Sequence, residues 1–216
     1  MTAARPDALL LLTSSCPYCP TVLQGLSELV KSGLIGRLEV VNIGVRPEVA
    51  QQLGVRSVPW VRLGPFELEG LQSPAELKQW AERAGKPDGL AEYFRDLLKD
   101  GQLARVTGYI RRHAAAVGDL IKLLAGPDVE LTVRIGISAV FEELEGDTAL
   151  HDAFDTLAPL SRHQDAHIRA DAAHLMSLTH RPEAIPHLER LLGDSVADVV
   201  EIAREGLERL RGKKGN

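Results

Sequence analysis

Cysteine is scarce in this sequence. Only two cysteines, Cys16 and Cys19, occur among the 216 residues. Because no further cysteine is left to form structural bridges, the sequence excludes a disulfide-rich secreted scaffold, and we expect a protein of the reducing cytoplasm. Aromatic residues are also few, at 4%, whereas leucine and alanine are abundant. This composition favours helices, because alanine and leucine have high helix propensities.

Long apolar runs and an excess of basic residues are both missing. No stretch of about 18 apolar residues occurs, so we expect no membrane-spanning helix. The net charge of -5 gives no basic surface of the kind that binds nucleic acid, which we exclude as a partner. The first residues superficially resemble a signal peptide, but Asp7 interrupts them and the apolar run at 8–12 is short. We therefore expect that run to be a buried strand.

A change in pattern near residue 85 predicts two domains. The first 84 residues predict the order βαβαββα, with strands at 8–13, 38–43, 60–63 and 66–69 and helices at 21–32, 47–53 and 73–84. The segment 85–89, GKPDG, has turn chemistry and predicts a linker, and residues 90–216 show helical patterns. Residues 1–84 carry eight basic and eight acidic residues, whereas the remainder carries 17 and 22. The negative charge therefore belongs to the helical part.

The two cysteines stand where the first strand gives way to the first helix, in the sequence Cys16-Pro17-Tyr18-Cys19. We expect Cys16 to be the N-cap of that helix and Pro17 its first residue. Free N–H groups and partial positive charge at a helix N-terminus stabilise a thiolate there. Because prolines cannot donate, Tyr18 and Cys19 are expected to offer the N–H groups nearest the Cys16 sulfur. Cys19, one turn further, is placed to attack a mixed disulfide on Cys16, which predicts thiol–disulfide exchange with Cys16 attacking and Cys19 resolving.

Two other interpretations of the cysteine pair are open. Half of a structural zinc site would need two more cysteine or histidine ligands, but no further cysteine exists and residues 1–84 contain no histidine. Two inert, buried cysteines are the second alternative, although a helix start flanked by prolines is an unusual place for them. We expect neither a metal nor a cofactor at the pair.

Residues 8–84 resemble a thioredoxin-fold domain of the kind found in glutaredoxins and protein disulfide oxidoreductases. The resemblance is carried by the CPYC sequence after the first strand and by Val58-Pro59 just before the third strand. It implies that the Val58–Pro59 bond is cis, that Pro59 shapes the loop facing the cysteines, and that Val58 offers its backbone to a bound peptide or thiol. Together with Pro17 and Tyr18, these two residues form the expected substrate-binding surface.

The sequence departs from this family pattern at two places. Leu10 stands six residues before the first cysteine, where thioredoxins carry a buried acid that aids proton transfer. The segment 64–74, GPFELEGLQSP, lacks the Gly-Gly and the Asp with which glutaredoxins hold glutathione. The sequence therefore leaves glutathione dependence open. We expect Trp60, which follows the proline, to belong to the core.

The helical part contains a drifting repeat. The pairs Val133-Arg134, Ile168-Arg169 and Val200-Glu201 recur at intervals of 35 and 32 residues, each near the start of a helix that follows a short turn. A period of this size is typical of helix-pair solenoids. Residues 90–216 resemble HEAT repeats, which implies a face that binds protein partners. A plain helical bundle is the alternative.

The helical part also contains all seven histidines. His163, His167, Asp171 and His174 are spaced so that a single helix would align them on one face, which would suit a metal ion. Because the turn around His163 interrupts the run, we expect surface residues there rather than a metal site.

Together these patterns predict a disulfide oxidoreductase that acts on a protein disulfide or thiol and whose helical repeats recognise the partner protein. The alternative is a HEAT-type adaptor whose thioredoxin-like domain binds a partner without turnover.

Overall fold

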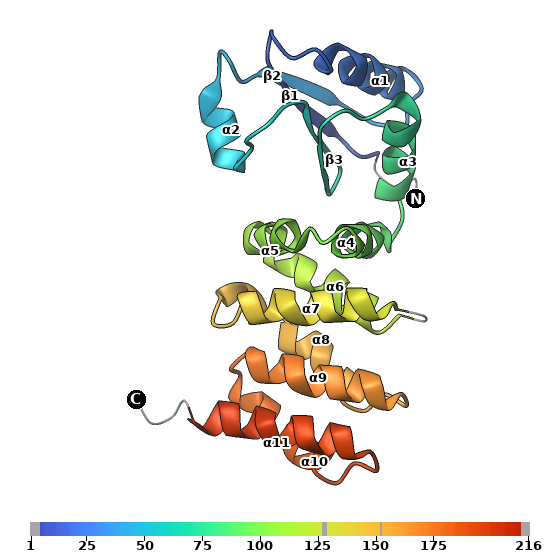
Figure 1. Ribbon diagram of the computed structural model, residues 1–216. Helices are drawn as coiled ribbons and strands as arrows, with labels where there is room; N and C mark the ends of the chain where they lie inside the picture. The colour runs from blue at the N-terminus through green and yellow to red at the C-terminus, as the bar shows by residue number, and fades with distance from the viewer. Residues whose placement is uncertain (1–4, 127–128, 152, 213–216) are drawn as a thin grey trace. The chain divides into compact units, whose positions relative to one another are not determined.

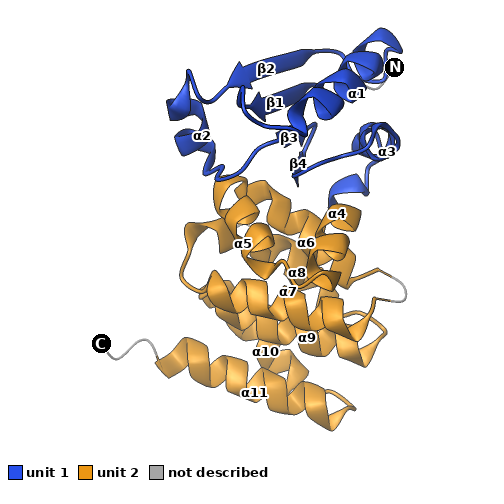
Figure 2. Ribbon diagram, turned by 45° about the horizontal axis from the view of Figure 1, so that its top comes forward, with its two compact units in different colours: residues 1–90 blue, residues 91–216 orange. Residues whose placement is uncertain are grey.

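The computed structural model describes residues 5–126, 129–151 and 153–212. The chain forms two compact units, residues 1–90 and 91–216 (Figure 2). Helix α3 (Pro74–Ala84) ends just before the predicted linker, and helix α4 (Gly89–Lys99) begins at the last residue of that linker. The turn between the two helices is therefore shorter than expected. That each part folds on its own stays a prediction.

The first unit is built on a four-stranded mixed sheet with the order β2-β1-β3-β4. The strands are β1 (Ala8–Leu12), β2 (Leu38–Asn42), β3 (Trp60–Leu63) and β4 (Phe66–Glu69). Strand β1 lies parallel to β2 and antiparallel to β3, which in turn is antiparallel to β4. The register places Leu11 opposite both Val41 and Trp60. The end of β1 and the start of β3 therefore meet at the same edge of the sheet.

Three helices cover the two faces of this sheet (Figure 1). They are α1 (Cys19–Lys31), α2 (Pro47–Leu53) and α3 (Pro74–Ala84). Leu9 and Leu11 point to one face, where they pack in a buried cluster joined by Val49 and Leu53 of α2. Leu10 points to the opposite face, because successive strand residues alternate, and α1 and α3 pack against each other and against the sheet. The predicted βαβαββα order of a thioredoxin-like domain is confirmed.

The start of α1 corrects one prediction. Cys16 was expected as the N-cap, but the helix begins at Cys19 and Tyr18 is its N-cap. The carbonyl of an N-cap residue accepts the first bond of the helix from the N–H four residues on. For Cys16 that residue would be Pro20, which has no N–H. The first bond instead runs from the Val22 N–H to the Tyr18 carbonyl, at 3.4 Å.

The start of α3 follows the sequence closely. The Ser73 hydroxyl accepts from the Glu76 N–H at 3.3 Å, and the Glu76 carboxylate accepts from the Ser73 N–H at 2.7 Å. This reciprocal capping box satisfies two backbone donors that the helix itself cannot pair. Pro74 takes the first helical turn, where the absence of an N–H costs nothing.

The described residues of the second unit form helices joined by turns and loops, without a strand. After α4 come α5 (Leu103–Arg112), α6 (Val117–Leu124), α7 (Leu131–Glu143), α8 (Ala153–Leu160), α9 (Ala166–Leu178), α10 (Ile185–Leu191) and α11 (Ala197–Gly212), with short 3-10 turns at 114–116, 148–150 and 182–184. Helices α5, α7, α9 and α11 pack in succession, while α8 packs on α9 and α10 on α11 (Figure 1). No described helix is long and apolar enough to cross a membrane.

The register of the predicted repeat is wrong in its last copy. Val133 and Ile168 are buried at the expected anchor positions, but at the start of α11 the buried residue is Val199, and Val200 is only half-buried. By burial, the residues that correspond to the first two pairs are Val199 and Val200, one residue earlier than predicted.

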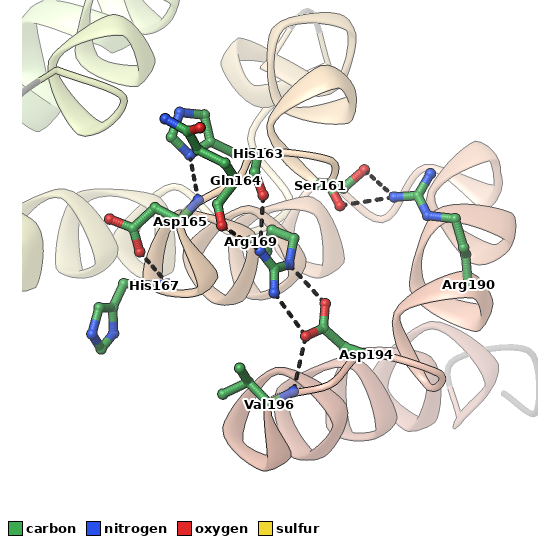
Figure 3. A network of polar contacts seen from close by, with 9 residues as sticks. All are labelled: Ser161, His163, Gln164, Asp165, His167, Arg169, Arg190, Asp194 and Val196. Atoms are coloured by element: carbon green, nitrogen blue, oxygen red, sulfur yellow. Dashed lines mark hydrogen bonds and ion pairs between the residues drawn. The ribbon is translucent and has the colours of Figure 1, made fainter.

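Arg169 links its own helix, α9, to the turn before α9 and to the turn before α11 (Figure 3). Its guanidinium donates two bonds to the Asp194 carboxylate, at 2.7 and 2.8 Å, and two more to the His163 and Gln164 carbonyls, both at 2.9 Å. Asp194 also accepts from the Val196 N–H at 3.0 Å, just before α11. The Arg169 hydrogen bonds lower the pKa of the Asp194 carboxyl below its ordinary value. The ion pair therefore fastens the turn before α11 to the turn before α9.

We expect Asp194→Asn to lower the free energy of unfolding of the full chain by about 2 kcal/mol at neutral pH, because hydrogen bonds to charged groups contribute about that much. Since folding lowers this pKa, the contribution is complete above the ordinary aspartate value of about 3.9 and is lost as the pH falls through the folded-state value. Urea unfolding followed by far-ultraviolet circular dichroism measures the difference between wild type and variant. Glu208→Gln, at an exposed position of α11, is the matched control. A difference that stays constant into strong acid would contradict the assignment.

Candidate active site

The loop between β1 and α1 brings the two cysteines together. The Cys16 N–H donates to the Thr13 carbonyl at 3.3 Å, which turns the chain sharply after the strand. The Cys19 N–H, the first of the helix, then donates to the Cys16 sulfur at 3.1 Å. Of the two N–H groups expected near this sulfur, that of Cys19 therefore makes the contact. The sulfur thus receives a donor of the helix start although Cys16 lies outside the helix.

Cys16 and Cys19 form a disulfide, with their Cα atoms 5.6 Å apart. Cys19 is buried, with 2% of its surface exposed, whereas Cys16 is half-buried. Between them Pro17 is exposed and Tyr18 is 55% exposed. An external thiol or disulfide therefore has access to the Cys16 sulfur and not to that of Cys19.

A side-chain bridge fixes the loop that precedes Cys16. The Asn42 amide, at the end of β2, donates to the Ser14 hydroxyl at 3.0 Å. The carbonyl oxygen of the same side chain accepts from the Gly44 N–H at 2.9 Å, which orients the amide. The bridge ties the cysteine loop to the neighbouring strand of the sheet. Neither residue is among those predicted from the sequence, although an asparagine two residues before a glycine at a strand end is a turn signal.

The Val58–Pro59 peptide bond is cis, as the family resemblance implied. Pro59 is buried and its carbonyl accepts from the Gly70 N–H at 2.9 Å, while Val58 is half-buried beside the Leu9 and Leu11 cluster. Because Trp60 pairs with Leu11 in the antiparallel ladder, this loop enters the sheet at the edge where β1 delivers the cysteine loop. Trp60 itself is a core residue, 3% exposed, as expected.

Strand β1, which leads to the cysteine pair, carries apolar side chains. Leu10, at the position where a proton-transferring acid was considered, is completely buried. The side chains of β1 thus supply no carboxylate to assist the inner cysteine. In the disulfide state neither sulfur titrates.

Of the four side chains considered as metal ligands, three lie on α9 (His167, Asp171 and His174) and His163 does not. His163 precedes α9, and its ring nitrogen accepts from the Asp165 N–H at 3.1 Å (Figure 3). His174 contacts the Glu142 carboxylate of α7 at 3.3 Å, and Asp171 is bonded by Arg134. Among the described residues, no group of three or more His, Cys, Asp or Glu side chains is placed to hold a metal ion.

Comparison with known families identifies residues 8–82 as matching the family model of a thioredoxin domain. No curated protein sequence matches the chain. A thioredoxin-like domain with a closely spaced cysteine pair supports a thiol–disulfide oxidoreductase at a general level and suggests thiol substrates. The individual roles assigned to Pro17, Tyr18, Val58 and Pro59 stay predictions.

The difference in exposure makes the two thiols distinguishable. After reduction of the full chain, we expect brief iodoacetamide treatment at neutral pH to alkylate Cys16 about tenfold or more faster than Cys19, because the reactive thiolate must be accessible. Mass spectrometry of the digested protein measures both sites. In urea the two thiols are expected to react at similar rates, which controls for the reagent. Faster alkylation of Cys19 in the folded protein would reverse their assignment.

Proposed function

We propose that this protein is a thiol–disulfide oxidoreductase that acts on protein disulfides through Cys16 and Cys19, and that its helical unit recognises the partner. The observation that carries the proposal is the asymmetry of the pair. Cys16 is accessible and its sulfur accepts a backbone N–H, while Cys19 is buried behind it. An accessible sulfur with a local donor suits the attacking position, and a buried one suits the resolving position.

The reaction proceeds in two exchanges. In the reduced protein the Cys16 thiolate attacks one sulfur of the substrate disulfide, which forms a mixed disulfide and releases the first substrate thiolate. Cys19 loses its proton to solvent or to the departing thiolate and attacks the Cys16 sulfur, which releases the second substrate thiolate. The substrate gains two electrons and the protein becomes the Cys16–Cys19 disulfide. The same steps in reverse oxidise a substrate dithiol.

Backbone hydrogen bonding at the Val58–Pro59 loop is the proposed means of holding the substrate. The loop enters β3 at the sheet edge that also delivers the cysteines, and Val58 precedes the proline whose carbonyl is already bonded to Gly70. In this proposal the Val58 backbone forms hydrogen bonds with the substrate chain. Pro17 and Tyr18 supply exposed contact surface beside the reacting sulfur.

The helical unit is proposed to consist of HEAT-like repeats. Two observations support this assignment over a plain bundle: α5, α7, α9 and α11 pack in succession, and Arg169 joins the turns that precede two of these helices. Stacked helix pairs expose a continuous face, which is the usual binding surface of such units.

Trapping tests the chemistry directly. We expect Cys19→Ser to keep the first exchange and to accumulate a mixed disulfide with its substrate, because the second exchange has lost its nucleophile. Cys16→Ser is expected to form none. Non-reducing electrophoresis followed by mass spectrometry of the bands measures the two outcomes on the full chain. Trapping on Cys16→Ser would reverse the roles of the two cysteines, whereas failure of the wild type to reduce any small disulfide would favour the adaptor that binds without turnover.

Truncation tests whether the first unit carries the thiol chemistry and the helical unit recognises the partner. A fragment of residues 1–84 retains the whole sheet and helices α1 to α3, and a domain of this size is marginally stable alone. We expect it to keep most of the activity towards a small disulfide and to lose capture of the protein partner. The measurement compares both rates for the fragment and the full chain, with circular dichroism as the folding control. Loss of both rates in a folded fragment would mean that the helical unit completes the active site.

A further inference from the structure

A hollow lies on the surface that α7, α9 and α11 form together. Its volume is about 550 Å³, within the range of about 300–1,000 Å³ that is usual for binding sites. Its described lining residues come from these three helices or from Val129, just before α7. The hollow therefore belongs entirely to the helical unit and contains no residue assigned to the thiol chemistry.

Large, exposed apolar side chains line part of the hollow. Leu131 and Ile135, one turn apart on α7, are 72% and 60% exposed, and Ile202 of α11 lines the same hollow. Apolar side chains at positions i and i+4 project from one side of a helix. An exposed apolar patch with a polar rim is the kind of surface that binds a partner.

The charged side chains around this patch are mostly acidic. Among the described residues, three carboxylates, one guanidinium and the imidazole of His167 line the hollow. The guanidinium, Arg134, is bonded to Asp171 across the interface of α7 and α9, which uses both charges internally. Glu142, which contacts His174, and Asp198 are the remaining carboxylates, and both are exposed. Carboxylates therefore lie beside exposed apolar side chains in the lining of the hollow.

We propose that this hollow binds an amphipathic, basic segment of the partner protein, with apolar side chains over Leu131, Ile135 and Ile202 and lysine or arginine beside Glu142 and Asp198. The proposal rests on the proposed function in taking the thiol substrate as that partner. A second copy of this chain fits less well, since residues 85–216 hold 22 acidic against 17 basic residues and like charges repel.

The first measurement uses the full wild-type chain and a fluorescein-labelled helical peptide of about 14 residues, with leucine on one face and lysine on the other. We expect saturable binding by fluorescence anisotropy. The affinity should fall at least about tenfold between low salt and about 1 M salt, because the screening length shrinks from about 30 Å to about 3 Å. A peptide with glutamate in place of each lysine should not bind. Equal binding of the two peptides would overturn the proposal.

Variants of the full chain locate the site. Ile135→Gln is expected to weaken binding about tenfold through lost apolar contact, and Asp198→Lys about fivefold or more through charge reversal. Leu192→Gln and Glu208→Lys make the same chemical changes at exposed positions outside the hollow and should bind as the wild type does. An equal effect of the control variants would overturn the location.

The outcomes separate this inference from the proposed function. Reduction of a small disulfide without specific peptide binding would overturn the inference and leave the chemistry standing. Specific peptide binding by a chain that exchanges no disulfide would overturn the chemistry and leave the surface standing. If light scattering shows a dimer that the peptide dissociates, the second-copy alternative replaces the proposal.

Discussion

The hydrogen bond from the Cys19 N–H to the Cys16 sulfur is the contact on which the site depends. Cys16 cannot be the N-cap of α1, because Pro20 has no N–H to offer to its carbonyl, and the helix begins at Cys19. The first helical N–H is available to the sulfur outside the helix. Cys19 is buried on the first turn, whereas Cys16 is half-buried in the loop. The start of the helix therefore separates the two cysteines in both hydrogen bonding and access.

The sheet supplies the second constraint. With β1 between β2 and β3, the end of β1 has a neighbour on each side. Asn42 on one side bonds Ser14 of the cysteine loop, and the Val58–Pro59 loop enters on the other. The cysteine loop is therefore anchored by the strand on one flank and faces a buried proline turn on the other. Rigid support of this kind keeps the spacing of the reacting groups constant during exchange.

Much of this arrangement could be predicted from the sequence, because its signals are local. Apolar periodicity and the Ser73 and Glu76 pair each depend on neighbouring residues, and the elements that they predict are present. The pattern is misleading at the start of α1, because Pro17 favours a first helical turn there, whereas Pro20 removes the N–H that the Cys16 carbonyl would need. The Asn42 bridge could not be predicted, since residues 28 apart meet only through the strand order.

Net charge is distributed unevenly between the two units, and this affects how a substrate can be selected. Exchange between thiols is chemically general, and the residues 1–84 that contain both cysteines have balanced charge, so long-range attraction adds little choice among substrates there. The helical unit carries the entire net charge, and its hollow joins that charge to exposed apolar side chains. Under the proposed function, a partner bound by the helical unit would meet the cysteine pair at an effective concentration far above that in solution, because the two units are one chain. A moderate affinity at the hollow would then be sufficient to select which disulfide reaches Cys16, and would still allow the reduced product to leave.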